Sequence, residues 1–316
     1  MQRHKTVLLI DETHKILQEK LKAKGYTVDF CPQYTYEDLV SCIDSYDALV
    51  VRSKVIIDKR LLDCAKNLKC IARSGAGMDA IDVEYAQSKG IVCLNSPEGN
   101  RDAVGEHTVG LLLCLLNKIN SADSQVRNFL WQREYNRGLE LNCRTVGIIG
   151  YGNMGKAFAK RLKGFGCKVI AYDKYLQNYT DEFAGQCTLK ELYAEADILS
   201  LHVPLTDETK YMVNTEFINS FRKPFFLINT SRGKTVRLAD LLQAMKQKKV
   251  LGCALDVLES ESHSQQIESN ESLNAMLKEL FAMENTVFTP HVAGWTKESY
   301  YKLADTLADK IIKVLG

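Results

Sequence analysis

The chain has 316 residues, which is enough for about two domains with substantial hydrophobic cores. Hydrophobic residues make up 46% of it and charged residues 25%, the proportions of an ordinary globular protein, and no apolar run is long enough to span a membrane. A formal net charge of +2 argues against a dominant nucleic-acid-binding surface.

The ten cysteines are scattered and form no CxxC pair, so we expect no zinc or other metal site. Most of them lie in apolar segments, which is typical of reduced core thiols in a cytoplasmic protein. The apolar run near the N-terminus has four residues and is too short for a signal peptide. We therefore expect a cytoplasmic protein with neither nucleic acid nor membrane as a partner.

Residues 1–99 alternate short apolar strands with helical patterns, which favours a parallel sheet covered on both faces. The expected strands are Val7–Ile10, Thr27–Cys31, Ala48–Val51, Cys70–Ala72 and Ile91–Leu94. The expected helices are Ile16–Lys24, Tyr36–Ser45, Asp58–Ala65 and Val83–Lys89. Next comes a helix over Asp102–Lys118 that is apolar nearly all round, so either its own fold or a partner subunit must bury it. The more polar stretch Asn120–Asn142 is interpreted as a connecting arm.

The segment Thr145–Asp173 combines a strand, a glycine turn, a helix and a second strand that ends in an acid. Gly150 suits the tight turn, Gly152 a close approach of backbone to a pyrophosphate, and Gly155 close packing of helix on strand. The helix N-terminus offers N–H groups to an anion, and Asp173 stands where a carboxylate accepts ribose hydroxyls. The pattern predicts dinucleotide binding, with an ordinary βαβ turn as the alternative.

After Asp173 the alternation resumes, and four further strands bring this half of the chain to six, the count of a complete dinucleotide-binding sheet. These strands are Asp197–His202, Phe225–Thr230, Leu251–Asp256 and Thr286–Thr289. The helices are expected at Leu189–Ala196 and Arg237–Gln247, and a last one at Lys297–Val314.

Polar residues gather where these strands end, and ligands of open α/β sheets bind at that edge. They are Asp173, His202, Asn229–Thr230–Ser231–Arg232, Asp256, Glu259, Glu261 and His291. Taken singly, each equally suits a structural role: His202 could cap a turn, and the Glu259–Glu261 run could be a solvated face. Together they provide what hydride transfer from a secondary alcohol requires: an imidazole base, a carboxylate to orient it, and a guanidinium for the substrate carboxylate.

Six segments of the chain, in this order, resemble the D-2-hydroxyacid dehydrogenase family, and within it the phosphoglycerate dehydrogenases. They are RSGAGMDAIDVEYAQSKGIVCLNSPEGNRDAVGEHTVGLLL (73–113), TVGIIGYGNMG (145–155), LHVPLT (201–206), INTSRG (228–233), ALDVLESE (254–261) and TPHVAGWT (289–296). The resemblance implies two doubly wound parallel-sheet domains. A Rossmann-type NAD-binding domain (100–287) would be inserted into a flavodoxin-like substrate-binding domain (1–99 and 288–316).

The resemblance also implies roles for individual residues. The catalytic residues would be Arg232, Glu261 and His291, with Glu259 as the competitor for the carboxylate. The residues expected to bind NAD are Gly150, Gly152, Asn153, Met154, Gly155, Asp173, His202, Val203, Pro204, Thr230, Ser231, Arg232, Asp256, His291 and Gly294. Asp256 would hydrogen-bond the nicotinamide amide. The residues expected to bind substrate are Arg52, Ser53, Arg73, Gly75, Ala76, Gly77 and Arg133. Residues Asp102–Asn142 would build a homodimer.

The expected reaction is oxidation of 3-phosphoglycerate to 3-phosphohydroxypyruvate by NAD, because Arg52, Lys54, Arg73 and Arg133 offer cations for a phosphate ester. Trp295 stands where phosphoglycerate dehydrogenases more often have a small residue, so erythronate-4-phosphate dehydrogenase and glyoxylate or hydroxypyruvate reductase stay as alternatives. An NADH-sensing, corepressor-like binding protein is the alternative of a different class. The segment 262–285 is longer than the family's usual loop, polar at first and then helical. The sequence ends at Gly316, so we expect no regulatory extension and no feedback inhibition by serine.

Overall fold

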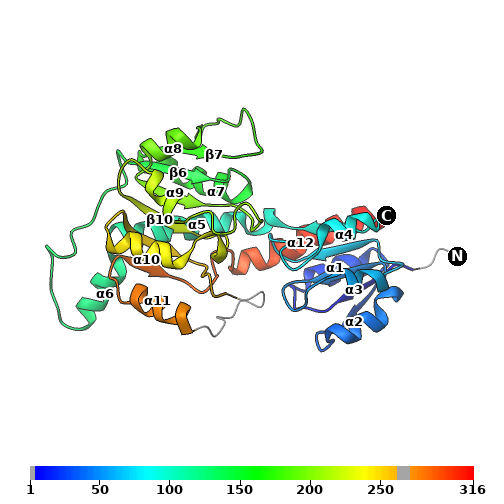
Figure 1. The fold of residues 1–316 in the computed structure, drawn as a ribbon. Coiled ribbons are helices and arrows are strands. Elements are labelled where there is room, and N and C mark those ends of the chain that lie inside the picture. The colour runs from blue at the N-terminus through cyan, green and yellow to red at the C-terminus, as the bar shows by residue number, and fades with distance from the viewer. Residues whose placement is uncertain (1–3, 262–270) are drawn as a thin grey trace. The chain divides into compact units, whose positions relative to one another are not determined.

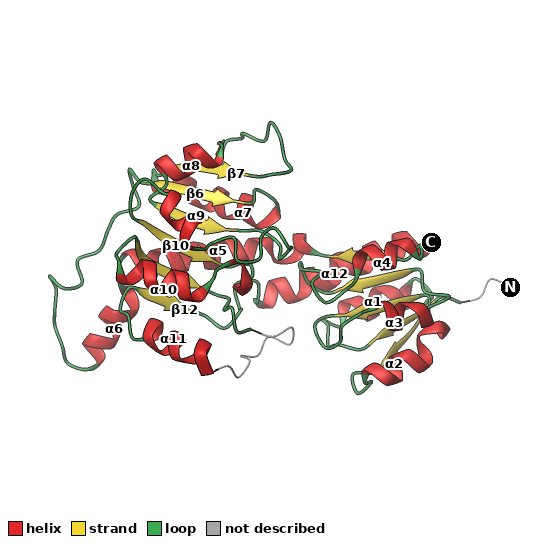
Figure 2. Cartoon of the chain, in the orientation of Figure 1, coloured by secondary structure: helices red, strands yellow, loops and turns green. Residues whose placement is uncertain are grey.

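The computed structural model of the protein describes residues 4–261 and 271–316 (Figure 1). These residues divide into two compact units, one formed by residues 4–100 with 295–316 and the other by residues 101–261 with 271–294. Each unit is built on one sheet of parallel strands with helices on its faces (Figure 2). The expected class, two doubly wound α/β domains, is confirmed.

The second boundary between the units falls at residue 295, whereas the sequence placed it at 288. Strand β12 (Thr286–Phe288) pairs with β11 (Val250–Leu255), and the loop that follows it is hydrogen-bonded to Asp256 at the end of β11. These bonds keep residues 288–294 with the second unit.

The sheet of the first unit has the strand order β2-β1-β3-β4-β5, which is the flavodoxin-like order. Its strands are β1 (Thr6–Leu9), β2 (Thr27–Phe30), β3 (Ala48–Val51), β4 (Cys70–Arg73) and β5 (Val92–Asn95). Its helices are α1 (Ile16–Ala23), α2 (Tyr36–Cys42), α3 (Lys59–Cys64), α4 (Val83–Ser88) and α12 (Lys297–Leu315). The five strands agree with the five expected from the apolar runs.

Side chains alternate between the two faces of this sheet, so β1 feeds two separate cores. Leu8 packs in the core under α2, α3 and α4, whereas Val7 and Leu9 pack with α1 and α12. In α12 the buried residues recur at helical spacing, from Ala304 through Leu307 and Ala308 to Ile311. The last helix of the chain therefore covers the first sheet beside α1 (Figure 1).

The sheet of the second unit has the order β12-β11-β10-β9-β6-β7-β8, in which the chain starts in the middle and winds toward both edges, as in a Rossmann fold. Its strands are β6 (Thr145–Ile149), β7 (Lys168–Tyr172), β8 (Gly185–Gln186), β9 (Ile198–Leu201), β10 (Phe225–Asn229), β11 and β12. Its helices are α6 (Ile119–Arg127), α7 (Asn153–Leu162), α8 (Leu189–Glu195), α9 (Thr215–Ser220), α10 (Leu238–Lys246) and α11 (Glu271–Phe281). Helix α5 (Pro97–Leu116) carries the chain from the first unit into the second.

Three expectations need correction. The sheet has seven strands instead of six, because the two-residue β8 pairs with β7 and has no apolar run of its own to reveal it. The helix expected from Asp102 begins at Pro97, a residue that suits the first turn of a helix. The expected arm opens with α6, which a left-handed Lys118 separates from α5. The helical part of segment 262–285 is present as α11, while its polar start, 262–270, lies outside the described residues.

Helices α5 and α7 cover one face of this sheet, and α8 to α11 pack on the other. Among the described residues, no helix has the length and apolar character to cross a bilayer. Because all seven strands are parallel, their carboxyl ends lie at one edge. The residues that follow these ends form the candidate site.

Candidate active site

The glycine turn after β6 has the geometry of a phosphate-binding turn. Gly150 has φ +91°, and a Cβ there would lie 2.4 Å from the carbonyl oxygen of His202. A Cβ on Gly155 would lie 2.0 Å from the carbonyl oxygen of Gly150, so the helix packs onto the turn without a side chain between them. At Gly152 a Cβ would meet nothing within 4 Å, and this residue begins α7 with no side-chain cap. The first N–H groups of α7, from Asn153 onward, are thus left for an anion.

Asp173 lies at the end of β7, beside that turn. One of its carboxylate oxygens accepts the Tyr151 N–H at 2.8 Å, and the other accepts the N–H groups of Tyr175 and Leu176 at 2.9 and 3.0 Å. A carboxylate has about four lone-pair positions. Three of them therefore fix its orientation, and about one is left to accept a hydrogen bond from a ribose hydroxyl.

His202, after β9, is a neutral histidine. Its Nε2 lies 2.9 Å from the Ser200 hydroxyl, its ring packs 5.5 Å from the Phe158 ring, and its Nδ1 is buried without a hydrogen-bond partner in the described structure. Burial lowers the pKa of His202 to about 3. Its side chain lies against Ser200 and Phe158, while the backbone of His202 and the side chain of Val203 approach the glycine turn. Pro204 begins the next turn, accepting a hydrogen bond from Thr209 at 2.6 Å.

The loop after β10 carries the predicted guanidinium. The Asn229 side chain accepts from the backbone and the hydroxyl of Ser231, at 3.0 and 2.7 Å, and donates to the carbonyl of Arg232 at 2.9 Å. A Cβ on Gly233 would lie 1.8 Å from the carbonyl oxygen of Leu258, so the loop after β11 lies directly against this one. Thr230 meets the hydroxyl of Thr108, on α5, at 3.2 Å.

Asp256, at the end of β11, is 1% exposed and braces the loop that holds His291. Its carboxylate accepts the N–H groups of Val292 and Ala293, both at 2.9 Å, and the hydroxyl of Thr289 at 2.5 Å. The expected hydrogen bond between Asp256 and the nicotinamide amide would have to use a carboxylate lone pair that these three bonds do not occupy. In this structure the carboxylate positions the loop.

His107, on α5, completes this network and was missed from the sequence. Its Nε2 lies 3.0 Å from the Thr289 hydroxyl and 3.7 Å from Asp256. The signal in the sequence was the polar run Glu106–His107–Thr108, which lies just before the apolar second half of this helix. Helix α5 thereby places two polar side chains at the sheet edge, one against β10 and one against β12.

His291 and Glu261 are in direct contact, Nδ1 against a carboxylate oxygen. His291 has φ +54°, a left-handed conformation that few residues other than glycine adopt, and its N–H donates to the carbonyl of Asp256 at 2.7 Å. Glu259 instead accepts the N–H of Leu238 at 2.7 Å, at the start of α10. The geometry thus pairs Glu261, and not Glu259, with the imidazole.

Two of the expected substrate cations lie at the carboxyl ends of neighbouring strands of the first unit: Arg52 follows β3, and Arg73 is the last residue of β4. Val51 of β3 pairs with Arg73 of β4, and the Arg73 Nε donates to the carbonyl of Arg52 at 3.2 Å. The Arg52 N–H donates to Asp11 at 2.5 Å, and burial lowers the pKa of the Arg52 guanidinium. Lys54 is bonded to the carbonyl of Pro32 at the surface.

The Gly75–Ala76–Gly77 loop follows β4 and is anchored by residues after β5. The carbonyl of Gly75 accepts from Ser96 at 2.9 Å, and that of Ala76 from Asn95 at 2.6 Å. The Arg73 guanidinium lies against Gly75, where a Cβ would be 2.2 Å from it. Ser53, Arg52, Arg73 and this loop therefore gather at the carboxyl edge of β3 and β4. Arg133 is exposed on the segment after α6, in the second unit.

In the described part of the chain, no group of three or more His, Cys, Asp or Glu residues could hold a metal ion. The chemistry of the second unit is that of a dinucleotide site with an acid–histidine pair at the same sheet edge.

A sequence model of the D-isomer specific 2-hydroxyacid dehydrogenase, NAD binding domain, matches residues 109–293. The chain belongs to the D-isomer specific 2-hydroxyacid dehydrogenases. It is an NAD-dependent oxidoreductase, so the corepressor-like alternative is set aside. The uncapped start of α7 and the open space at Gly152 fit the pyrophosphate of this cofactor.

Three members of the family that resemble this chain are named for different substrates. The hydroxypyruvate reductase of Thermotoga maritima is 36% identical over 89% of this chain and 88% of its own length. The D-3-phosphoglycerate dehydrogenase of Archaeoglobus fulgidus is 33% identical over 98% of this chain, which spans 57% of that relative. The crystal structure of D-lactate dehydrogenase from Aquifex aeolicus, complexed with NAD and lactic acid, superposes with a TM-score of 0.83 at 27% identity, covering 98% of this chain and 96% of that one.

Proposed function

We propose that the protein is an NAD-dependent D-3-phosphoglycerate dehydrogenase, which interconverts 3-phosphoglycerate and 3-phosphohydroxypyruvate in serine synthesis. The observation that carries this substrate is the pair Arg52 and Arg73, two guanidinium groups at adjacent strand ends of one sheet. Two fixed cations at one edge suit a phosphate ester, because charge-assisted hydrogen bonds are strong when the donors are already in place. The similarity to the Archaeoglobus fulgidus enzyme over 98% of the chain supports it.

The acid–base chemistry is assigned to His291 and Glu261. In the oxidation, Nε2 of His291 would take the proton of the substrate hydroxyl, while Glu261 at Nδ1 holds the ring and stabilises its cationic form. In the reduction the same proton returns to the carbonyl oxygen. Bound NAD supplies hydride acceptance at the substrate carbon, two electrons with one hydrogen. Asp256 keeps the His291 loop in place throughout.

The substrate carboxylate is assigned to Arg232 and to the backbone of Gly75–Ala76–Gly77. A guanidinium binds a carboxylate through two parallel hydrogen bonds and also stabilises charge that develops on the neighbouring oxygen. The loop after β10 holds Arg232 by its backbone carbonyl, through the Asn229 amide, so the arginine is presented from a fixed base.

A hydroxypyruvate reductase is the second candidate, and a specific contact favours it. The Arg52 guanidinium already lies on the Trp295 ring, 4.1 Å from its centroid, so this cation has a partner without any phosphate. The Thermotoga maritima relative, matched over most of its own length, supports this reading. Erythronate-4-phosphate and glyoxylate are also tested as substrates, because Trp295 stands where phosphoglycerate dehydrogenases more often have a small residue.

Paired kinetics with 3-phosphohydroxypyruvate and hydroxypyruvate decide between the candidates. A phosphoglycerate dehydrogenase should have the higher kcat/KM with the phosphorylated ketoacid. Equal efficiency on both, or a preference for hydroxypyruvate, would reject the phosphate assignment and leave the dehydrogenase chemistry intact. Erythronate-4-phosphate and glyoxylate are assayed in parallel.

We also infer a homodimer built through Asp102–Asn142. Large apolar side chains lie exposed along α6 and the segment that follows it, which extends away from the sheet of its own unit (Figure 1). They include Ile119, Val126, Phe129, Leu130, Trp131 and Leu139. Exposed apolar side chains gathered on one segment in this way are typical of a subunit interface. Arg133 would then approach the substrate site from the partner subunit. The ten cysteines, all unpaired, support a cytoplasmic location.

A further inference from the structure

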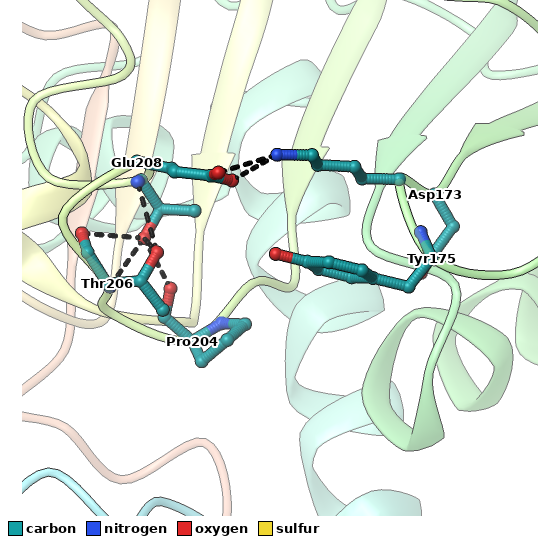
Figure 3. Close-up of polar contacts among 7 residues, drawn as sticks. Asp173, Tyr175, Pro204, Thr206 and Glu208 are labelled. Atoms are coloured by element: carbon teal, nitrogen blue, oxygen red, sulfur yellow. Dashed lines mark hydrogen bonds and ion pairs between the residues drawn. The ribbon is translucent and has the colours of Figure 1, made fainter.

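Two loops flank the glycine turn, because β7 and β9 are the neighbours of β6 in the sheet. The loop after β7 begins with Asp173 and Lys174, and the loop after β9 contains Glu208. The Nζ of Lys174 lies 2.6 Å from each carboxylate oxygen of Glu208. This ion pair joins the two loops at the carboxyl edge of the sheet, where the ribose is expected (Figure 3).

The position of Glu208 is set by a tight turn. The Thr209 hydroxyl donates to the carbonyl of Pro204 at 2.6 Å and accepts the N–H of Thr206 at 2.8 Å. Lys210 N–H closes the turn on the carbonyl of Thr206 at 2.8 Å. Glu208 is therefore held facing the loop after β7, and Figure 3 shows its carboxylate and the Tyr175 ring directed into the space between the loops.

The ion pair changes what Lys174 can do. A cation next to the strand-end acid is the group that accommodates a 2′-phosphate in NADP-dependent dinucleotide sites. Here the ammonium is engaged by both oxygens of a carboxylate. The hydrogen bond with Glu208 raises the pKa of Lys174, and the same bond lowers the pKa of Glu208, so both groups carry their charges at neutral pH.

The net charge of these side chains also favours NAD over NADP. Asp173, Lys174 and Glu208 together carry one net negative charge, which repels the additional phosphate of NADP. Without the charge of Glu208 the sum would be zero and the ammonium would be free to turn toward the ribose. Asp173 is held by three backbone N–H groups and stays in place in either case.

We propose that Glu208 is a specificity-determining residue that favours NAD(H) over NADP(H) by engaging Lys174. Two carboxylates from different loops then act together. Asp173 excludes the 2′-phosphate directly, and Glu208 engages the neighbouring Lys174 ammonium, which would otherwise bind it. Glu208 acts at the cofactor end of the site, so its role is independent of which hydroxy acid is the substrate.

The test is titration of the purified full-length protein with NADH and with NADPH, followed by nucleotide fluorescence. Glu208→Gln keeps the shape of the side chain and removes its charge. We expect the Kd for NADPH to fall about fivefold, the effect of one screened charge at close range, with a smaller change for NADH. The gain should shrink in high salt. In the double variant Glu208→Gln with Lys174→Met, the gain should disappear, because the freed ammonium is its source.

Glu279→Gln is the matched control. Glu279 pairs with Lys246 at 2.5 Å, and both side chains are exposed to about the same degree as those of Lys174 and Glu208. It lies on α11, which packs on α10, away from the loops that follow β7 and β9. An unchanged ratio of the two Kd values in Glu208→Gln, or a gain that persists without Lys174, would overturn the inference. Because the readout is cofactor binding alone, failure of the proposed substrate would not affect it.

Discussion

The guanidinium carbon of Arg52 lies 4.1 Å from the centroid of the Trp295 ring, although the two residues are separated by most of the sequence. The tryptophan in turn packs edge-on against Tyr300, with ring centroids 5.6 Å apart. Arg52 is thus held at the end of β3 by a stacked aromatic group. This contact holds the guanidinium whether or not a phosphate is bound, so replacing Arg52 is what separates the two candidate substrates.

Replacing Arg52 with Ala tests the proposed phosphate contact. Loss of a charge-assisted hydrogen bond should lower kcat/KM for 3-phosphohydroxypyruvate about 10- to 100-fold and leave the value for hydroxypyruvate nearly unchanged. Lys54→Ala removes the same charge two residues along, from a side chain bonded to Pro32, and should alter neither. A similar loss on both ketoacids in Arg52→Ala would point to a general role of Arg52 in the fold.

The His291→Asn variant tests the proposed base. Asparagine tolerates the left-handed conformation found at this position, so the loop should keep its shape. A positioned general base contributes about 10²–10⁴-fold, and turnover should fall by that factor while the Kd for NADH changes little. Turnover within a few-fold of wild type would remove His291 from the mechanism.

Glu261→Gln and Glu259→Gln separate the two carboxylates. Removing the charge at Glu261 weakens the group that orients the imidazole and stabilises its cationic form, so kcat for hydroxyacid oxidation should drop. Glu259 accepts a backbone N–H at the start of α10, a bond that glutamine retains, and its variant should keep the wild-type kcat. The reverse pattern would assign the catalytic carboxylate to Glu259.

His202 predicts a pH-dependent stability. Its pKa in the folded protein is about 3, below the value of about 6.5 in an unfolded chain, so the unfolded state binds more protons between these limits. The stabilisation is complete above about pH 6.5 and is lost as the pH falls toward 3, by about 2 kcal/mol at pH 5. Thermal unfolding at pH 7.5 and pH 5 should show a smaller difference in His202→Asn than in wild type. Replacing the exposed His4 by Asn should leave the difference unchanged.

Sedimentation of a Phe129→Ser, Trp131→Ser double variant tests the proposed dimer. Phe129 is 99% exposed and Trp131 79% exposed, so the substitutions remove little packing within the subunit. The variant should sediment as a monomer whose unfolding temperature is close to that of wild type, whereas wild type should sediment as a dimer. Monomeric wild-type protein at micromolar concentration would contradict the assignment.

Much of the fold was predictable because its signals are local. Most strands are short apolar runs and most helices are amphipathic, so the alternation alone predicts two parallel sheets. The glycine turn was also predictable from the sequence, since Gly150 and Gly155 permit contacts that any side chain would block. The two-residue strand β8 was not predicted, because the residues that pair with β7 form no apolar run.

Only the tertiary structure decided which polar groups meet, because that depends on how strands far apart in sequence lie in register. Spacing left Glu259 and Glu261 as competitors, and the contact with His291 distinguishes them. His107 joins Asp256 through Thr289 across about 150 residues of chain, which no local pattern reports. No local pattern pairs Lys174 with Glu208, and the two meet because β6 brings the loops after β7 and β9 to its two sides. Residue types and strand ends are properties of the chain, whereas their pairing is a property of the sheet.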